Sequence, residues 1–266
     1  MKTKVRKPRP VAANPDPALP AETPGGPDFH TPLTRTQIRK NIALADEAAH
    51  LAPYAIMCNN AYDRKRFIPL PAGWTEVAKL RNTLPAVGLA YAVFEKREDG
   101  RLTEVAIAFR GTDDLKDWIQ NLIPFFRIQL PPARRAFEQI LSRYANQSVK
   151  ISATGHSLGG GVAFHLSFVY PQVDAIAFNS SPVTKAGMKI QKGNRRISAW
   201  ESGEILQIVR NPVNWLRLRW RGVQRLEFRF QHGFFLSQHD MERLALNLVK
   251  LGALKSNQLQ ALTASW

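Results

Sequence analysis

The chain has 266 residues, 44% of them hydrophobic, and carries a formal net charge of +16. This length and composition exclude a wholly disordered chain and allow one large domain or two small ones. The single cysteine, Cys58, excludes an internal disulfide and belongs to no Cys/His cluster with the spacing of a zinc site.

The positive charge is concentrated in two zones of the sequence. Five of the first ten residues are Lys or Arg, and residues 185–229 hold eleven Lys or Arg against three Glu. Anionic lipid head groups and nucleic acid are both suitable partners for such zones. The charge by itself does not choose between them.

Residues 1–32 are predicted to form a disordered basic tail. They contain eight of the eighteen prolines and few large apolar residues. No apolar segment of the signal-peptide type follows the charged start, and the longest uncharged apolar run, residues 87–94, is too short to cross a bilayer. We therefore expect a cytoplasmic protein without a Sec signal, with peripheral membrane association or leaderless export left open.

From residue 33 onward the predicted elements alternate between helices and strands. Apolar residues recur at helical spacing over 33–57, and Pro53 is expected to break or restart this helix. The central strands are apolar without a polar face, which is typical of a mainly parallel sheet covered on both sides. We expect one α/β domain over 33–266. The other predicted elements are strands at 87–96 and 101–111, helices at 113–122 and 132–145, a strand at 149–155, a helix at 157–170, strands at 173–179 and 195–201, and a helix at 240–254.

The segment 155–159 reads GHSLG and lies between a predicted strand and a predicted helix. A nucleophile elbow forces its serine, here Ser157, into sparsely populated backbone angles and leaves room only for small residues two positions away on either side. Those positions are Gly155 and Gly159. The helix N-terminus adds partial positive charge beneath the serine. Ser157 is therefore the candidate nucleophile.

A serine that attacks an ester also needs hydrogen-bond donors for the tetrahedral oxyanion. One donor is the backbone N–H of the residue after the nucleophile, here Leu158. The other comes from a loop after an earlier strand, and the predicted strand at 101–109 is followed by Arg110-Gly111-Thr112. Gly111 permits a sharp turn, so the Thr112 amide is the second candidate donor. The alternative, that this loop only caps the next helix, is compatible with the same role.

Together these motifs resemble the class 3 lipase family of the α/β-hydrolase superfamily, in its bacterial lipase-like branch. The likeness rests on FRGT, DW and NL within 109–122, followed by TGHSLGGG at 154–161, and it covers roughly residues 80–205. The resemblance implies an α/β-hydrolase fold, in which helices flank a mainly parallel sheet, and a Ser–acid–His triad in that chain order. It further implies an oxyanion hole at the residue matching Thr112 and the hydrolysis of acylglycerol or phospholipid esters, with Ser157 as the nucleophile.

The acid of the triad is expected just after the strand at 195–201. The family usually carries an aspartate followed by two apolar residues, and Glu204 fits this form with glutamate in place of aspartate. Glutamate can equally orient an imidazole and stabilise its positive form. Glu201 is the second candidate.

The base is expected among the histidines after the acid. His239 stands immediately before the predicted last helix, where this fold places its base, and His232 is the alternative. A surface histidine without a role is the competing interpretation of either residue.

A basic, tryptophan-bearing insertion lies between the candidate acid and base. Apolar and basic residues nearly alternate over 215–230, which as strands would form a hairpin around Gly222 with one apolar and one cationic face. We expect it to dock the protein on a membrane, with aromatics at the head-group level and arginines on anionic phosphates. The competing interpretation is a pair of ordinary edge strands with solvated arginines. The proposed head-group contacts are Trp215, Arg217, Arg219, Trp220 and Arg221.

The sequence thus predicts a carboxylic-ester hydrolase of the lipase or phospholipase type that acts on glycerolipids at a membrane without a metal or organic cofactor. An anionic membrane surface and a lipid substrate are the expected partners, with no specific nucleic acid. A bacterial lipase toxin with a cognate immunity or secretion partner is compatible with these features. The alternative is a catalytically inactive hydrolase-fold protein that binds anionic membranes or nucleic acid through its basic surfaces.

Overall fold

The computed structural model describes most of the chain beyond the predicted tail. It describes residues 33–62, 65–80, 89–111, 122–181, 193–204, 206–207, 222–230 and 239–266, and for 122–129 the backbone alone. The predicted tail at 1–32 lies outside these ranges. So do nine of the ten residues of the helix predicted at 113–122 and the first half of the predicted hairpin.

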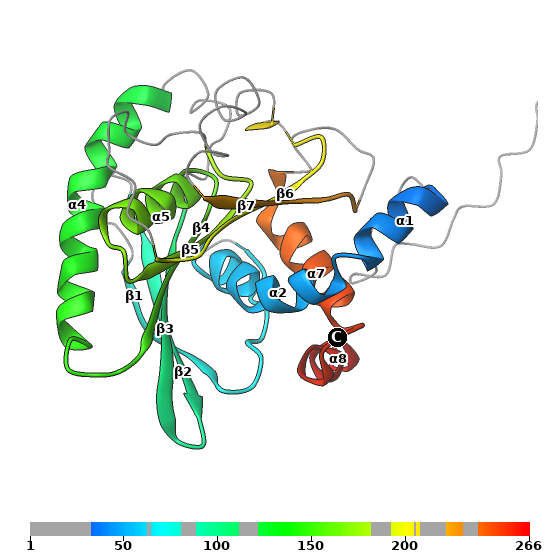
Figure 1. Cartoon of the computed structure of the whole chain (residues 1–266), viewed down its shortest axis with the longest axis horizontal. Helices are drawn as coiled ribbons and strands as arrows, with labels where there is room; N and C mark the ends of the chain where they lie inside the picture. The colour runs from blue at the N-terminus through cyan, green and yellow to red at the C-terminus, as the bar shows by residue number, and fades with distance from the viewer. Residues whose placement is uncertain are drawn as a thin grey trace, which may run out of the picture.

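A single mainly parallel sheet forms the centre of the molecule (Figure 1). Its seven described strands lie side by side in chain order, from β1 to β7. The first three are antiparallel neighbours, and every later strand is parallel to the one before it. The predicted class, a mainly parallel α/β sheet flanked by helices, is confirmed. The strands are β1 (Trp74–Leu80), β2 (Tyr91–Glu98), β3 (Arg101–Phe109), β4 (Lys150–His156), β5 (Val173–Phe178), β6 (Arg196–Glu201) and β7 (Val223–Phe228).

Helices cover both faces of this sheet (Figure 1). On one face α2 (Ala45–Asn60) and α7 (Met241–Gly252) pack together against the strands. On the other face lie α4 (Leu122–Arg143) and α5 (Leu158–Val169). Two short helices complete the described chain, α1 (Arg35–Ile42) near its start and α8 (Asn257–Ala264) at its end.

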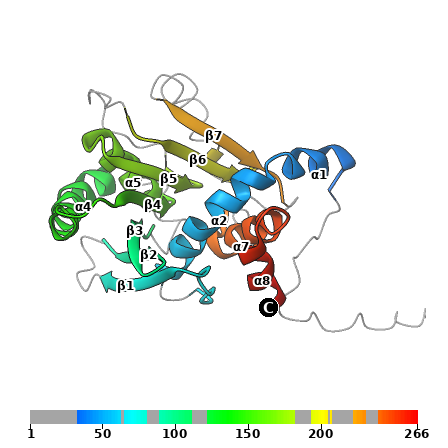
Figure 2. The same cartoon turned by 60° about the horizontal axis from the view of Figure 1, so that its bottom comes forward.

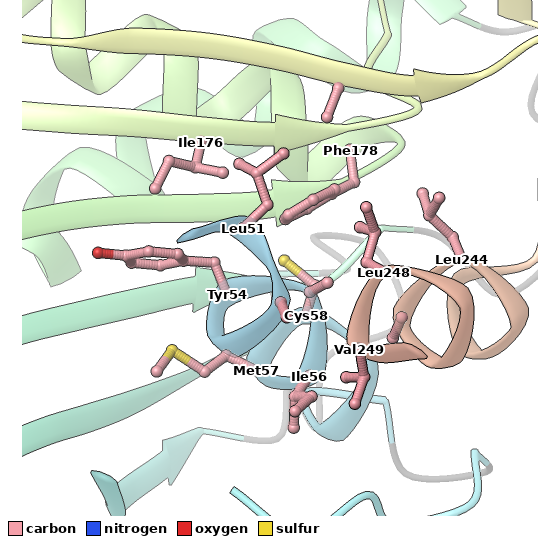
Figure 3. Close-up of a cluster of buried hydrophobic side chains, with 14 of the residues drawn as sticks. Leu51, Tyr54, Ile56, Met57, Cys58, Ile176, Phe178, Leu244, Leu248 and Val249 are labelled. Carbon is pink, nitrogen blue, oxygen red and sulfur yellow. The ribbon is translucent and has the colours of Figure 1, made fainter. Parts of the chain in front are cut away.

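Strand β5 shows how one sequence serves both faces, because successive side chains of a strand point to opposite sides. Ile176 and Phe178 pack with the side chains of α2 and α7, as Figure 3 shows. The alternate residues Ala175 and Ala177 lie against Phe164 of α5. Small residues on this side leave room for the aromatic side chains of α5, while large ones fill the space under α2 and α7.

Two predicted helix boundaries are wrong. Pro53 lies inside α2, and the break falls at residues 43–44 instead. An internal proline removes a backbone hydrogen bond and costs about 3 kcal/mol in a helix. Most of α2 is buried between the sheet and α7, and this burial offsets that cost. Similarly, α4 begins at Leu122 rather than at residue 132, so the apolar segment 122–132 forms its first turns.

Strand β7 corresponds to the second half of the predicted hairpin. It pairs in parallel with β6, with Arg196 opposite Val223 and Glu201 opposite Phe228. Its buried residues are Val223, Leu226 and Phe228, while the arginine and glutamate side chains between them are exposed. The described part of this segment is therefore an ordinary strand of the main sheet. Strand β1 and helix α8 were not predicted, whereas the last predicted long helix is confirmed as α7.

Candidate active site

Ser157 occupies a strained turn between β4 and α5. Its backbone angles are φ 55° and ψ −120°, a region that residues with a side chain rarely adopt. A Cβ atom added to Gly155 would lie 2.3 Å from the carbonyl atoms of Gly159, and one added to Gly159 would lie 2.0 Å from the carbonyl oxygen of Phe109. The two glycines are therefore required by the close approach of the backbone on either side of the serine, as the motif predicts.

Backbone hydrogen bonds on both sides hold this turn in place. The Ser157 N–H donates to the carbonyl of Phe178 at 3.0 Å, and the Ser157 carbonyl accepts from the N–H of Ser181 at 2.9 Å. Both partners belong to β5 and the residues after it, so the neighbouring strand fixes the serine backbone. Strain of this kind persists only where the surrounding structure over-determines it.

The side chain of Ser157 is buried, with 1% of the residue exposed, and its Oγ makes no hydrogen bond with any described residue. It stands at the N-cap position of α5, where the helix carries partial positive charge. Leu158 begins the helix, so its N–H is one of the first-turn amides that have no acceptor within the helix. A hydroxyl placed here is close to donors that suit a developing negative charge.

Glu204 and His239 form a buried pair at the same edge of the sheet. Oε2 of Glu204 lies 2.9 Å from Nδ1 of His239, and the two side chains are 0% and 6% exposed. The same carboxylate oxygen accepts the N–H of Leu206 at 2.8 Å. Glu204 follows the carboxyl end of β6, and His239 directly precedes α7. The carboxylate therefore orients the imidazole and leaves Nε2 as the ring nitrogen that faces away from it.

Glu201, the second candidate acid, is placed differently. It is the last residue of β6 and is buried, and its backbone N–H donates to the side-chain oxygen of Asn179 at 3.0 Å. Among the described residues, the hydrogen bond between a carboxylate and Nδ1 of His239 comes from Glu204. The loop after β6 is what carries Glu204 to the histidine.

Asp240 fixes the start of α7 next to His239. Its carboxylate accepts from the N–H groups of Glu242 and Arg243 as the helix N-cap, and it also pairs with Lys65. Burial opposes the charged form, but the hydrogen bond and charge of Lys65, together with the two amides, hold the pKa of Asp240 below its usual value. A charged Asp240 therefore anchors the backbone that carries His239.

His156 links three parts of the site that are distant in sequence. Its Nδ1 lies 2.9 Å from the hydroxyl of Tyr62, and that hydroxyl accepts the N–H of Gly111 at 3.1 Å. The His156 and His239 rings are 4.6 Å apart between centroids. The residue before the candidate nucleophile thus contacts the candidate base directly, and it reaches the loop after β3 through Tyr62.

Burial keeps the His156 imidazole neutral. Loss of solvent, followed by the proximity of His239, lowers the pKa of His156 well below 6.5, while the charge of Asp240 acts in the opposite sense. A neutral ring can pack against His239 without competing for the positive charge that the base must take up. No local sequence pattern assigns a role to His156, Tyr62 or Asp240, and only the tertiary contacts bring these residues into the site.

The loop after β3 lies against the serine. A Cβ atom added to Gly111 would be 3.0 Å from Cβ of Ser157 and 2.7 Å from the Tyr62 hydroxyl. Only glycine fits this approach, so the close packing of the loop against Tyr62 and Ser157 requires the glycine at this position. Thr112, the predicted oxyanion donor, follows directly but lies outside the described residues.

Other predicted residues also lie outside the described ranges. These are the alternative base His232 and the proposed head-group contacts Trp215, Arg217, Arg219, Trp220 and Arg221. Their roles stay predictions.

Residues 53–228 match the Phospholipase-like family, described as a Tle-like phospholipase domain. The chain belongs to this family. The matched region is about two thirds of this chain and includes Ser157 and Glu204. No curated protein matches the sequence significantly. The family match does not test the resemblance to the class 3 lipases or to their bacterial branch, which stays a prediction.

The Phospholipase-like chain is also similar to solved hydrolase structures. The Lip2 lipase from Yarrowia lipolytica matches with a TM-score of 0.45 and 14% identity, over 68% of this chain and 77% of the lipase. Lipase II from Rhizopus niveus gives 0.40 and 14%, over 68% and 78%. An esterase from Pyrobaculum calidifontis gives 0.38 and 12%, over 84% and 99%.

Metal-binding clusters and membrane-spanning helices are both absent from the described part of this chain. No group of three or more His, Cys, Asp or Glu side chains there is placed to hold a metal ion. Within the same ranges no helix combines the length and apolar character needed to cross a bilayer.

Proposed function

We propose that the chain is a serine carboxylic-ester hydrolase of the phospholipase type, which acts on glycerolipids at a membrane surface. One observation carries the proposal. The carboxyl edge of the sheet presents Ser157 at φ 55° on a helix N-terminus, beside a buried carboxylate–imidazole pair. Membership of the Phospholipase-like family supports a lipid ester as substrate.

The geometry supports the roles proposed for the three side chains. Glu204 accepts a hydrogen bond at Nδ1 of His239, so Nε2 is the nitrogen that exchanges the proton with substrate and serine. The contact between the His156 and His239 rings supports this role, because His156 directly precedes Ser157. The hydrogen bond from Ser157 Oγ to His239 is not formed in this structure, and in the proposal it forms when substrate is bound.

The proposed reaction proceeds in two acyl transfers. Ser157 Oγ attacks the acyl carbonyl carbon as its proton moves to Nε2 of His239, and the resulting imidazolium is stabilised by Glu204. Nε2 then returns the proton to the glycerol oxygen as the carbon–oxygen bond of the ester breaks. A water molecule, deprotonated by the same nitrogen, attacks the acyl-enzyme and releases the fatty acid and the free serine.

The amides of Leu158 and Thr112 are the proposed donors to the oxyanion. The position of Leu158 at the first turn of α5 supports the first assignment. The close approach of Gly111 to Ser157 supports the second, because Thr112 is the next residue. In this arrangement Tyr62 and His156 are positioning residues that hold the loop after β3 at Gly111, the residue before Thr112.

Covalent labelling by a fluorophosphonate, combined with fatty-acid release from phospholipid vesicles, tests the proposal. We expect the wild-type protein to be labelled and to release fatty acid, and Ser157→Ala to do neither. In the same assay Glu204→Gln is expected to lower the rate by about a hundred-fold or more, since the imidazole loses its orienting charge. Glu201→Gln, three residues away, is the matched control and is expected to retain most of the activity.

Native wild-type protein that is neither labelled nor active would overturn the proposal. Binding of anionic vesicles or nucleic acid by such a protein would then favour the inactive, basic-surface alternative. A Glu201→Gln variant that loses more activity than Glu204→Gln would instead reassign the acid.

A further inference from the structure

Helix α1 exposes large apolar side chains that the fold does not use. Ile38 is 44% exposed and Ile42 is 51% exposed. The helix sequence RTQIRKNI contains three cationic residues and no acidic one. Residues three and four positions apart share one face of a helix, so Arg35, Ile38, Arg39 and Ile42 lie together. We call this set the α1 face.

The helix is nevertheless held in a defined position. A capping box closes its N-terminus, with the Gln37 N–H donating to Thr34 Oγ1 at 3.3 Å and the Thr34 N–H to Gln37 Oε1 at 2.8 Å. The Asn41 amide exchanges two hydrogen bonds with the backbone of Arg229, at 2.8 and 3.2 Å. Asn41 is the one buried residue of α1. The attachment to the protein therefore uses a polar residue and leaves both isoleucines outside.

This attachment places α1 at the catalytic edge of the sheet. Arg229 directly follows the carboxyl end of β7, and its guanidinium donates to the Ser202 hydroxyl at 2.7 Å. Ser202 lies two residues before Glu204 in the loop after β6. Figure 2 shows α1 beyond the tip of the β7 arrow. Helix α1 therefore lies at the same edge from which Ser157, Glu204 and His239 are presented.

We propose that the α1 face docks on an anionic phospholipid bilayer and brings this edge to the membrane. The inference rests on the proposed function, because it names the surface on which that site acts. Isoleucines among arginines suit the interface of a bilayer, where apolar side chains enter the acyl boundary and cations contact the phosphates. The ion pairs between described residues include none of Arg35, Arg39 and Lys40.

The charge of the chain favours a lipid surface over a second copy of the protein. The tail that precedes α1 carries five Lys or Arg in its first ten residues, and the whole chain is at +16. Two such cationic helices would repel each other, whereas phosphatidylglycerol or phosphatidylserine head groups would attract them. The binding of the α1 face is therefore expected to need both its isoleucines and an anionic lipid.

Sedimentation with vesicles tests the docking directly. The full chain carrying Ser157→Ala is mixed with vesicles of phosphatidylcholine alone or with added phosphatidylglycerol, so that binding is read without hydrolysis. The substitutions Ile38→Asp and Ile42→Asp together are expected to weaken binding to the mixed vesicles at least about ten-fold. Arg35→Glu with Arg39→Glu is expected to remove the preference for the anionic vesicles.

Leu254→Asp is the matched control. Leu254 is 59% exposed and follows the far end of α7, a helix that starts at the catalytic edge next to His239. We expect this variant to bind vesicles as well as its parent. In the active background, all variants are expected to hydrolyse a soluble short-chain ester at the wild-type rate, and only the α1 variants to lose activity on mixed vesicles.

Unchanged sedimentation of the Ile38→Asp, Ile42→Asp variant would overturn the docking proposal. A shift of that variant from dimer to monomer in size-exclusion chromatography, with vesicle binding intact, would assign the α1 face to self-association instead. If the wild-type protein hydrolyses neither soluble ester nor vesicles, the proposed function fails, while the sedimentation result still decides the docking.

Discussion

At the scale of single residues, the candidate site depends on positions where only one side chain fits. Gly155, Gly159 and Gly111 are glycines because another backbone or the serine itself occupies the space of a Cβ atom. Their absence of side chains lets three segments converge on Ser157 and hold it at a positive φ. The strain at one residue is thus supported by the packing of its neighbours.

The buried His156 predicts that the free energy of unfolding depends on pH. Its folded-state pKa lies well below 6.5 because of burial and the nearby His239, whereas in the unfolded chain it takes up a proton near pH 6.5. Below pH 6.5 the unfolded state therefore binds more protons at this residue than the folded state does. The free energy of unfolding should decrease there by up to about 1.4 kcal/mol per pH unit from this residue.

The variant His156→Gln is expected to show a smaller decrease, because its amide can still meet Tyr62 but does not titrate. Urea unfolding between pH 5 and 8 measures the effect. His239, Asp240 and Lys65 also surround the ring. Because these groups are present in both proteins, the comparison is between the slopes of the free energy of unfolding against pH for wild type and variant. Parallel pH curves for wild type and variant would show that His156 is not held neutral.

At the scale of elements, the candidate site is assembled from residues at the ends of strands and the starts of helices. Ser157 stands between β4 and α5, Glu204 follows β6, and His239 precedes α7. Parallel strands bring their carboxyl ends to one edge, which is where ligands of open α/β sheets bind. Helix α7 contributes differently, because its N-cap Asp240 fixes the backbone next to the histidine.

The N-cap of α7 is expected to matter for catalysis as well as for stability. Asp240→Ala removes the acceptor for two first-turn amides and should lower the free energy of unfolding by about 1 kcal/mol. It should also lower kcat on a soluble ester, because His239 is the adjacent residue. Ser256→Ala, which removes the side-chain cap of α8, is the control with a similar loss of stability and an unchanged kcat. Equal kcat values for the two variants would show that the Asp240 cap does not position His239 for catalysis.

At the scale of the whole molecule, the charge of +16 is the dominant long-range property. Part of it lies in α1, at the edge that carries the candidate site. A field of this sign raises the local concentration of anionic surfaces and orients the molecule as it approaches them.

This field predicts a specific dependence on salt. The screening length falls from about 30 Å at 0.01 M salt to about 10 Å at 0.1 M. Hydrolysis of vesicles that contain phosphatidylglycerol should therefore slow as salt is added, while hydrolysis of a soluble neutral ester stays constant. Fatty-acid release measured across this range checks it. An identical salt response on pure phosphatidylcholine vesicles would argue against attraction to anionic lipid.

The sequence by itself determined the features that depend on local pattern. Apolar strands alternating with helices predicted the α/β class, and the glycines around Ser157 predicted the turn, because periodicity and steric fit are properties of short segments. The resemblance to the class 3 lipases further pointed to Glu204 and His239, with Glu201 and His232 as the alternatives.

Only the tertiary structure decided which groups meet. Glu201 and Glu204 are three residues apart, and the hydrogen bond to His239 distinguishes them. Tyr62 reaches His156 across 94 positions, and no local pattern encodes such a contact. Pro53 was expected to break a helix because a propensity considers only the segment itself, whereas burial of α2 against the sheet and α7 outweighs it. Long-range packing, rather than local preference, therefore arranged the candidate site.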